Sequence, residues 1–392
     1  MMKKDFSRLD KLLENFAQNS VPGCTCSIMQ GDELIYEGGA GYADIASGKK
    51  VDANSMFRQA STTKLFTYAI LGMLYEEGVF LFSDPVGKYL PEWSNTQKYV
   101  VRPDGNVDVV PTERPLTIGH AVAMMCGLPY CMFPVHNAAT PTLAAMSERI
   151  AALLEKGTPT LQEEVRAMAD VPVQFEPGSH WLYGFGSEIA GALVETWTGK
   201  PLREVFRDRV IEPLELKNTD TFITPENRDR IVTNYSKKPD GTLEPSADFY
   251  DATMDPTITP VGARPNLVTS ATDFAIFMQM LANGGVYKGK KLLGAGTVEM
   301  LHANQLGAVQ LKDFENDYLA GYGYGYGFRT LITQAYGHNG HLGCFGWTGG
   351  AGSWVEADPV GKFSIAYMHN MAPNEELYHH HRVRAAAYGC ML

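Results

Sequence analysis

Ser61 and Lys64 form the first pattern in this chain that could do chemistry. They stand three residues apart at the start of the apolar stretch Ser61-Thr62-Thr63-Lys64-Leu65-Phe66. If a helix begins here, the hydroxyl and the amine lie on one face, a turn apart. A buried amine that has lost its charge can take the proton of a serine hydroxyl and activate it as a nucleophile. The pattern predicts a serine nucleophile with a lysine base, although Ser-x-x-Lys also occurs by chance and serine often caps helices.

Two further patterns follow in chain order. They are Pro177-Gly178-Ser179-His180-Trp181-Leu182-Tyr183-Gly184-Phe185 and Trp347-Thr348-Gly349-Gly350-Ala351-Gly352-Ser353. On spacing alone, the favoured interpretation of Tyr183 is an aromatic packing residue after a Pro-Gly turn. The corresponding alternative for the glycines is a turn between strands. The chain lacks a serine flanked by glycines at −2 and +2, and it lacks the H-E-x-x-H, C-x-x-C and Walker A motifs.

The histidines do not predict a metal site. His338 and His341 are three residues apart, but they lie in a glycine-rich loop without a clear carboxylate partner. His379-His380-His381 falls inside a predicted helix, which favours a partly exposed helical face over a metal site or a tag. We therefore expect no metal and no cofactor.

Taken together, the three patterns resemble the motifs of the serine β-lactamase and penicillin-binding-protein superfamily. The chain looks closest to the class C β-lactamase-like branch, which includes family VIII esterases, D-aminopeptidases and acyltransferases. The resemblance spans nearly the whole chain. It also includes Asp84-Pro85-Val86 with Tyr89-Leu90-Pro91, Leu116-Thr117-Ile118 leading to Gly127-Leu128, and Thr269 to Phe274 ahead of Leu281-Ala282-Asn283-Gly284-Gly285.

The resemblance implies a role for each catalytic residue. Ser61 would attack an acyl carbonyl and form an acyl-enzyme. Lys64 would be desolvated, with a lowered pKa, and would share protons with Ser61. Tyr183 would pass the proton to the leaving group and later activate water or an alcohol, helped by the nearby Lys64 charge. The backbone N–H groups of Ser61 and Gly350 would bind the oxyanion.

Two positions depart from the family pattern. Trp347 stands where a lysine or histidine usually binds a substrate carboxylate, and Phe185 stands where an asparagine usually binds a substrate amide. Both changes remove polar recognition and add aromatic area, which favours esters or amides with an apolar acyl group. We expect Phe185, Trp347, Thr348 and Gly349 to bind substrate. His338 and His341 lie just upstream and could offer a cation at low pH, which keeps an anionic substrate open.

The leading interpretation is an esterase-like serine hydrolase acting on a small-molecule ester or amide. Acyl transfer to an alcohol or amine would use the same residues. A β-lactamase or D-amino-acid peptidase is the alternative enzyme. A penicillin-binding-like sensor domain, which keeps the serine but loses deacylation, is the alternative from another class.

The predicted elements place strands at both ends of the chain and helices between them. Strands are expected at Cys24–Met29, Glu33–Glu37, Tyr322–Leu331, Gly350–Ala357 and Lys362–His369. Helices are expected at Phe6–Asn19, Ser61–Glu76, Leu116–Met125, Met146–Glu155, Leu161–Ala169, Glu188–Thr198, Ala271–Ala282 and Glu375–Ala387. This order predicts a single α/β (α+β) β-lactamase-like domain over 1–392. An antiparallel sheet from 1–60 and about 320–392 would be flanked by helices, with an all-helical lobe inserted in the simplest layout. Residues of about 61–319 would form this mainly helical lobe, with insertions.

Composition narrows the partners. The 392 residues carry a net charge of −11 and no basic patch, so nucleic acid and anionic membranes are not expected partners. No apolar run is long enough to span a bilayer, and the polar start lacks a signal peptide, which favours a cytoplasmic location. Six cysteines are too sparse for a disulfide scaffold and are expected to be reduced. The oligomeric state does not follow from the sequence.

Overall fold

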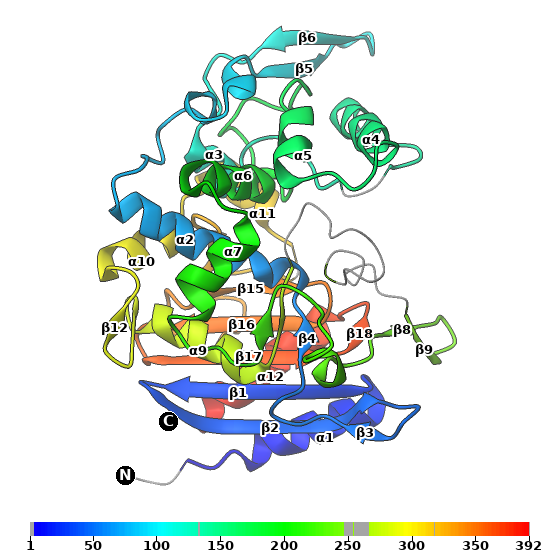
Figure 1. The fold of residues 1–392 in the computed structure, drawn as a ribbon, viewed down its shortest axis with the longest axis vertical. Coiled ribbons are helices and arrows are strands. Elements are labelled where there is room, and N and C mark those ends of the chain that lie inside the picture. Colours follow the sequence, from blue (N-terminus) through cyan, green and yellow to red (C-terminus); the bar gives the residue numbers. More distant parts are fainter. Residues whose placement is uncertain (1–3, 132–133, 247–253, 255–265, 317, 392) are drawn as a thin grey trace.

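Both ends of the chain build one antiparallel sheet (Figure 1). The structure is a computed structural model described for residues 4–131, 134–246, 254, 266–316 and 318–391. The strand order is β13-β14-β15-β16-β17-β1-β2-β3, and β1 joins the two ends by pairing with β17 from Cys24↔His369 to Gln30↔Phe363. These strands are β1 Gly23–Gln30, β2 Glu33–Asp44, β3 Lys49–Lys50, β13 Tyr322–Tyr324, β14 Arg329–Leu331, β15 Phe345–Gly349, β16 Ser353–Asp358 and β17 Phe363–His369.

Helices cover both faces of this sheet. On one face, α1 (Ser7–Asn19) and α12 (Glu376–Cys390) pack against each other and against the strands, and α1 buries Leu9, Leu13 and Phe16. On the other face, α9 (Ala271–Ala282) packs across β1, β16 and β17. The alternation of apolar Cys24, Cys26 and Ile28 with polar residues along β1 sends these three side chains toward α1. The predicted fold class is therefore confirmed. The protein has a mixed α/β fold, and its antiparallel sheet is built from both chain ends.

The inserted part is organised around α2 (Lys64–Glu76). Its residues from Leu65 to Leu74 are all buried, as expected for a helix that is apolar on every side. α6 (Gly186–Thr198) packs against it. The other helices and turns are η1 Ala60–Thr63, η2 Val86–Lys88, η3 Pro91–Ser94, α3 Ile118–Val122, α4 Pro141–Leu154, α5 Leu161–Ala167, α7 Leu202–Phe206, η4 Arg207–Ile211, η5 Arg228–Arg230, α10 Ala295–His302 and α11 Ala308–Phe314.

The expectation of an all-helical lobe was wrong, because this part also contains short strands. They are β5 Gln97–Val101, β6 Val107–Pro111, β7 Thr219–Asp220, β8 Tyr235–Lys237, β9 Leu243–Pro245, β10 Val268–Thr269, β11 Val286–Tyr287 and β12 Lys290–Lys291. Two of them pair with strands outside this part: β10 with β4 Phe57–Arg58, and β8 with β18 Met371–Ala372. The β5–β6 hairpin projects from the lobe at the top of Figure 1. The division of the chain into lobes at residues 60 and 320 stays a prediction.

Two predicted strands of the C-terminal part differ from the observed elements. The strand expected over Tyr322–Leu331 is a hairpin of β13 and β14. The strand expected from Gly350 begins at Ser353, because Gly350 to Gly352 form a turn closed by the Gly352 N–H donating to the Gly349 carbonyl at 2.9 Å. Gly352 has a φ of 106°, which a glycine adopts readily. The strand β15 that precedes this turn was not predicted as a separate element.

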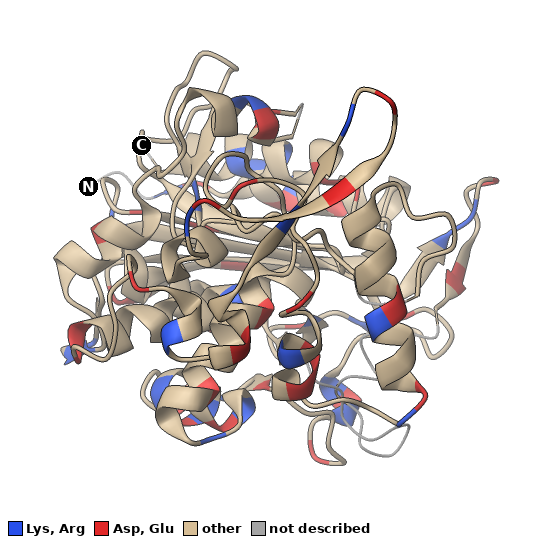
Figure 2. Cartoon of the chain, turned by 90° about the horizontal axis from the view of Figure 1, so that it is seen from above, with Lys and Arg blue, Asp and Glu red and all other residues tan. Residues whose placement is uncertain are grey.

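Acidic and basic residues are interspersed along the chain in Figure 2. Within the residues that the structure describes, no helix is both long and apolar enough to cross a membrane.

Candidate active site

Ser61 lies in η1, a 3-10 turn that runs directly into α2. The predicted helix therefore begins with one tighter turn, and Lys64 is the first residue of α2. The ammonium of Lys64 donates to Ser61 Oγ over 3.0 Å, so the two side chains meet as their spacing predicts. Ala60, directly before Ser61, has a φ of 49°, a conformation that costs energy for a residue with a Cβ atom. The nucleophile candidate thus sits on a strained turn.

The third motif, Trp347 to Ser353, lies directly against the backbone just before Ser61. A Cβ atom on Gly349 would lie 2.0 Å from the Gln59 carbonyl oxygen, so only glycine fits at this approach. Ser353 Oγ donates to the same carbonyl at 3.1 Å and lies 2.9 Å from Thr62 Oγ1. These contacts fix η1 against the end of β15 and the start of β16.

Tyr183 reaches the same place from the loop before α6. Backbone N–H groups of Leu182 and Phe185 donate to the carbonyls of Met124 and Leu128, and they hold this loop along the segment after α3. The Tyr183 ring centroid is 5.5 Å from Lys64 Nζ. On the other side, Trp347 Nε1 donates to the Tyr183 hydroxyl at 3.4 Å. The structure thus brings together one residue from each of the three motifs around Lys64.

Aromatic rings form one wall of this site. The ring of Tyr183 stacks on Tyr130 and on Trp347, with centroids 5.8 Å and 5.5 Å away. Tyr324 meets the edge of Trp347 at 5.2 Å, and Tyr130 also lies 5.2 Å from Lys64 Nζ. The sequence analysis missed Tyr130. Its signal is the Gly127-Leu128-Pro129 turn directly before it, which follows a helix that ends beside the second motif.

The pKa of Lys64 is shifted in the opposite direction to the one expected. Burial by itself lowers the pKa of Lys64, but Tyr130, Tyr183 and Glu188 favour its charged form. Their sum raises the pKa of Lys64 above the usual 10.5, so the predicted lowering was wrong. The sequence analysis also missed Glu188, which is only 6% exposed. Its signal is a carboxylate in the first turn of a helix that is otherwise apolar through Val194.

The chain is similar to known proteins over most of its length. A family profile described as beta-lactamase matches residues 9–389. The chain belongs to the beta-lactamase family. It is 25% identical over 366 residues to protein Rv1367c of Mycobacterium tuberculosis, covering 90% of this chain and 86% of that protein. It is 27% identical over 243 residues to esterase EstB of Burkholderia gladioli, covering 61% and 56%.

Solved structures agree on the fold of this beta-lactamase-family chain. EstCE1, described as a hydrolase with promiscuous acyltransferase activity, superposes with a TM-score of 0.79 and covers 98% of both chains at 22% identity. At that identity the likeness shows the fold alone.

Two residues that we expected to bind substrate point elsewhere. Phe185 is 1% exposed and packs in the main hydrophobic core, so it offers no surface to a substrate. Thr348 alternates with Trp347 along β15, and its side chain turns toward α12. There Thr348 Oγ1 donates to Glu376 Oε1 at 2.9 Å.

His338 and His341 do not come near Ser61. His341 Nδ1 lies 2.7 Å from Oδ2 of Asp358, which ends β16, whereas the Ser61 turn contacts Ser353 at the start of that strand. Five residues along a strand span roughly 17 Å. His338 is buried, its Nε2 lies 2.7 Å from the Ala320 carbonyl, and burial lowers its pKa. Neither histidine therefore supplies the expected cation beside Ser61 at low pH.

Gly350 is exposed and is the first residue of the turn directly after Gly349. Its role as the second oxyanion donor stays a prediction, as do the catalytic roles of Ser61, Lys64 and Tyr183. Within the described residues, no group of three or more histidine, cysteine or acidic side chains could hold a metal ion.

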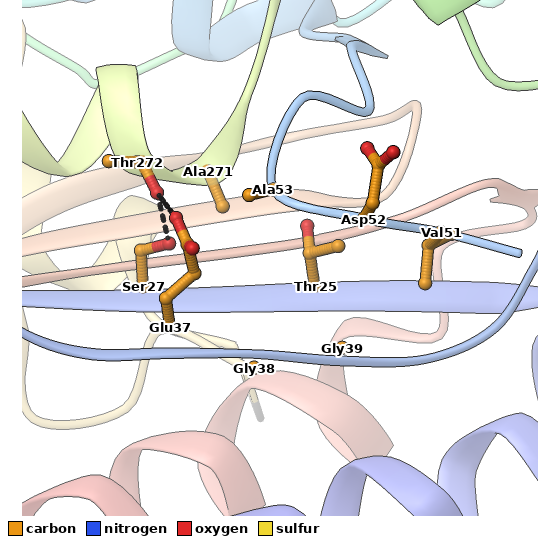
Figure 3. Close-up of a pocket in the computed structure, with 10 residues that line it drawn as sticks. All are labelled: Thr25, Ser27, Glu37, Gly38, Gly39, Val51, Asp52, Ala53, Ala271 and Thr272. Atoms are coloured by element: carbon orange, nitrogen blue, oxygen red, sulfur yellow. Dashed lines mark hydrogen bonds between the residues drawn. The ribbon is translucent and has the colours of Figure 1, made fainter.

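A separate cavity of about 140 Å³ lies on the α9 face of the sheet (Figure 3). It is lined by Thr25, Ser27, Glu37, Gly38, Gly39, Val51, Asp52, Ala53, Ala271 and Thr272. Thr272 Oγ1 donates to Glu37 at 2.6 Å and lies 2.8 Å from Ser27 Oγ, so this end of the cavity is tied together by its own hydrogen bonds. None of the predicted catalytic residues line it.

Proposed function

We propose that this chain is an esterase-like serine hydrolase that cleaves a small-molecule ester or amide through a Ser61 acyl-enzyme. The observation that carries the proposal is the 3.0 Å contact of Lys64 with Ser61, beside the ring and hydroxyl of Tyr183. The family supports acyl chemistry, and the relative named esterase EstB supports an ester substrate.

The proposed reaction begins with attack of Ser61 Oγ on the acyl carbonyl carbon. The Ser61 proton passes to Tyr183, which reacts as a phenolate paired with the Lys64 ammonium, and the carbonyl oxygen becomes an oxyanion that the N–H groups of Ser61 and Gly350 bind. The bond to the leaving group then breaks, and the leaving oxygen or nitrogen takes the proton from Tyr183. Water, or an acceptor alcohol, then attacks the acyl-enzyme and gives its proton to Tyr183. Tyr183 returns this proton to Ser61 Oγ as the acyl group leaves. Lys64 stays an ammonium throughout and stabilises negative charge on Oγ.

The proposed substrate has a neutral, apolar part beside the reacting carbonyl. Trp347 contributes a ring stacked on Tyr183 where a carboxylate-binding cation is usual, and neither histidine replaces that cation. A substrate carboxylate would lose its hydration here without gaining a charged partner. This supports esters over penicillin-like substrates and over a D-amino-acid peptidase role.

The test is turnover of short p-nitrophenyl esters and of nitrocefin by the wild type and by Ser61→Ala. We expect ester turnover to far exceed nitrocefin turnover and to vanish in Ser61→Ala, with circular dichroism unchanged. Ser47→Ala, an exposed serine in the turn after β2, serves as the matched control. Full activity of Ser61→Ala would exclude the mechanism, and the reverse substrate ranking would exclude the ester assignment.

Intact-mass spectrometry after an ester pulse separates the enzyme from a sensor domain. An enzyme returns to its free mass as the acyl group is hydrolysed or transferred. A lasting adduct on Ser61 without turnover would instead support the sensor alternative.

A further inference from the structure

Asn374 lies in the segment between β18 and α12, and its side chain contacts the end of β15. Its Nδ2 donates to the Gly349 carbonyl at 3.1 Å and to Glu376 Oε1 at 2.8 Å. Because both partners are acceptors, the two contacts depend on the N–H groups of the side-chain amide. Asn374 is partly buried, and the proposed mechanism gives it no role.

Two further hydrogen bonds hold the Asn374 amide in place. The backbone carbonyl of Asn374 accepts the ring N–H of His369, whose Nε2 lies 3.0 Å away. Glu376 Oε1 also accepts the hydroxyl of Thr348 at 2.9 Å, so Glu376 connects Asn374 to the same strand that Asn374 contacts. Asn374 is therefore fixed at its backbone by β17 and at its side chain by the start of α12.

The Gly349 carbonyl belongs to the same peptide unit as the Gly350 N–H. A peptide unit is planar, and in the trans form its C=O and N–H bonds point in opposite directions. The Gly349 carbonyl accepts two hydrogen bonds, one from Asn374 Nδ2 at 3.1 Å and one from the Gly352 N–H at 2.9 Å. Bonds that fix this carbonyl therefore also fix the direction of the Gly350 N–H.

This peptide unit needs such bonds, because it lies between two glycines. Neither Gly349 nor Gly350 has a Cβ atom that would restrict its rotation. On the side of its α-carbon, Gly349 lies against the Gln59 carbonyl, two residues before Ser61. Among the residues that the structure describes, none accepts the Gly350 N–H in a hydrogen bond. This donor is therefore available to a ligand beside the Ser61 turn.

We propose that Asn374 is a positioning residue that directs the Gly350 N–H toward the oxyanion of the reacting acyl group. This inference rests on the proposed function, which makes that N–H the second oxyanion donor. Asn374 acts through the Gly349 carbonyl and not on the reacting atoms. Because an oxyanion hole works through donors that are oriented before the reaction, rotation of this peptide unit would weaken transition-state binding more than substrate binding.

The test observes this peptide unit directly by NMR. Only three glycines in the chain directly follow another glycine, namely Gly39, Gly285 and Gly350. In protein labelled with glycine that carries ¹³C at the carbonyl and ¹⁵N at the amide, a spectrum that correlates each amide with the preceding carbonyl therefore shows these three signals. Gly350→Ala identifies the signal of interest. Its ¹³C shift reports the Gly349 carbonyl, and its residual dipolar coupling reports the direction of the Gly350 N–H.

Asn374→Asp keeps the shape of the side chain but removes both N–H donors, and Asn374→Ala removes the whole amide. In each variant we expect the Gly349 carbonyl ¹³C signal to move upfield and the Gly350 coupling to change, while Gly39 and Gly285 keep theirs. Asn339→Ala is the matched control, because this exposed asparagine donates to the Ala385 carbonyl in α12. It should leave all three signals unchanged. An unchanged Gly349–Gly350 signal in either folded Asn374 variant would overturn the proposal.

Turnover of a p-nitrophenyl ester gives the second measurement. Loss of an oxyanion donor lowers kcat by about 10²–10³-fold, so a misdirected donor should lower kcat by roughly tenfold and leave KM within about twofold. A changed Gly349–Gly350 signal with full kcat would overturn the positioning role. Absence of ester turnover in the wild type would instead count against the proposed function, and the NMR signals would still decide whether Asn374 sets the direction of the Gly350 N–H.

Discussion

Acid should destabilise this protein through His369, the last residue of β17, which has no exposed surface. Its Nε2 lies 3.0 Å from the Asn374 carbonyl and donates to it, and its Nδ1 accepts the Met371 N–H at 3.3 Å. A second proton would turn that acceptor into a donor facing another donor. Burial lowers the pKa of His369 to about 4, although Glu375 and the Asn374 bond favour the charged form.

The sign and size of the effect follow from linkage. An unfolded histidine titrates near 6.5, so below that pH the unfolded chain binds a proton that the folded chain refuses. The stabilisation is complete above pH 6.5 and is lost as the pH falls toward 4. For His369, the free energy of unfolding should drop by about 2 kcal/mol between pH 7.5 and pH 5. His379, whose ring lies 4.9 Å away, adds to the drop, because burial lowers its pKa to about 3.

Urea unfolding at pH 7.5 and pH 5 measures this loss. His369→Gln keeps an N–H donor for the Asn374 carbonyl but cannot gain a proton, so its drop should be smaller than that of the wild type by about 2 kcal/mol. His136→Gln, at an exposed position, should keep the wild-type drop. Equal drops in the wild type and in His369→Gln would refute the reasoning.

Three further outcomes are expected. Gly349→Ala should abolish ester hydrolysis without loss of secondary structure, because its Cβ atom would meet the Gln59 carbonyl at 2.0 Å; Gly296→Ala, with nothing within 4 Å, is the control. Trp347→Lys should lower the kcat/KM for apolar esters by roughly tenfold through the lost stacking on Tyr183, and should raise nitrocefin turnover relative to esters. All six cysteines are buried thiols, so Ellman's reagent should react slowly with the native protein and should count six thiols in urea.

The sheet and the nucleophile pair were predictable because their signals are local. Alternating or continuous apolar segments bounded by glycine and Asp-Pro turns indicate strands wherever they pair. Ser61 and Lys64 are three residues apart on one turn, so their contact needs no distant information. The β5–β6 hairpin also had a local signal, valine-rich strands around Asp104-Gly105, which the sequence analysis overlooked.

The rest of the site depends on contacts between distant segments. Phe185 and Thr348 were assigned to the substrate side from motif position, but the loop register and the strand alternation turn them into the core and toward α12. His341 has its carboxylate partner 17 residues further on, across β15 and β16. The raised pKa of Lys64 depends on Tyr130, Tyr183 and Glu188, which all come from segments distant from Lys64 in the sequence.

These charges bear on substrate choice. In the proposed mechanism, the Lys64 ammonium stabilises negative charge at the reacting oxygen. Trp347 adds no cation, and the chain as a whole carries a net charge of −11. On approach, this net negative charge would work against carboxylate-bearing substrates. Under the proposed function, selection would rest on the stacked rings of Tyr130, Tyr183 and Trp347, which would favour neutral acyl groups with apolar or aromatic character.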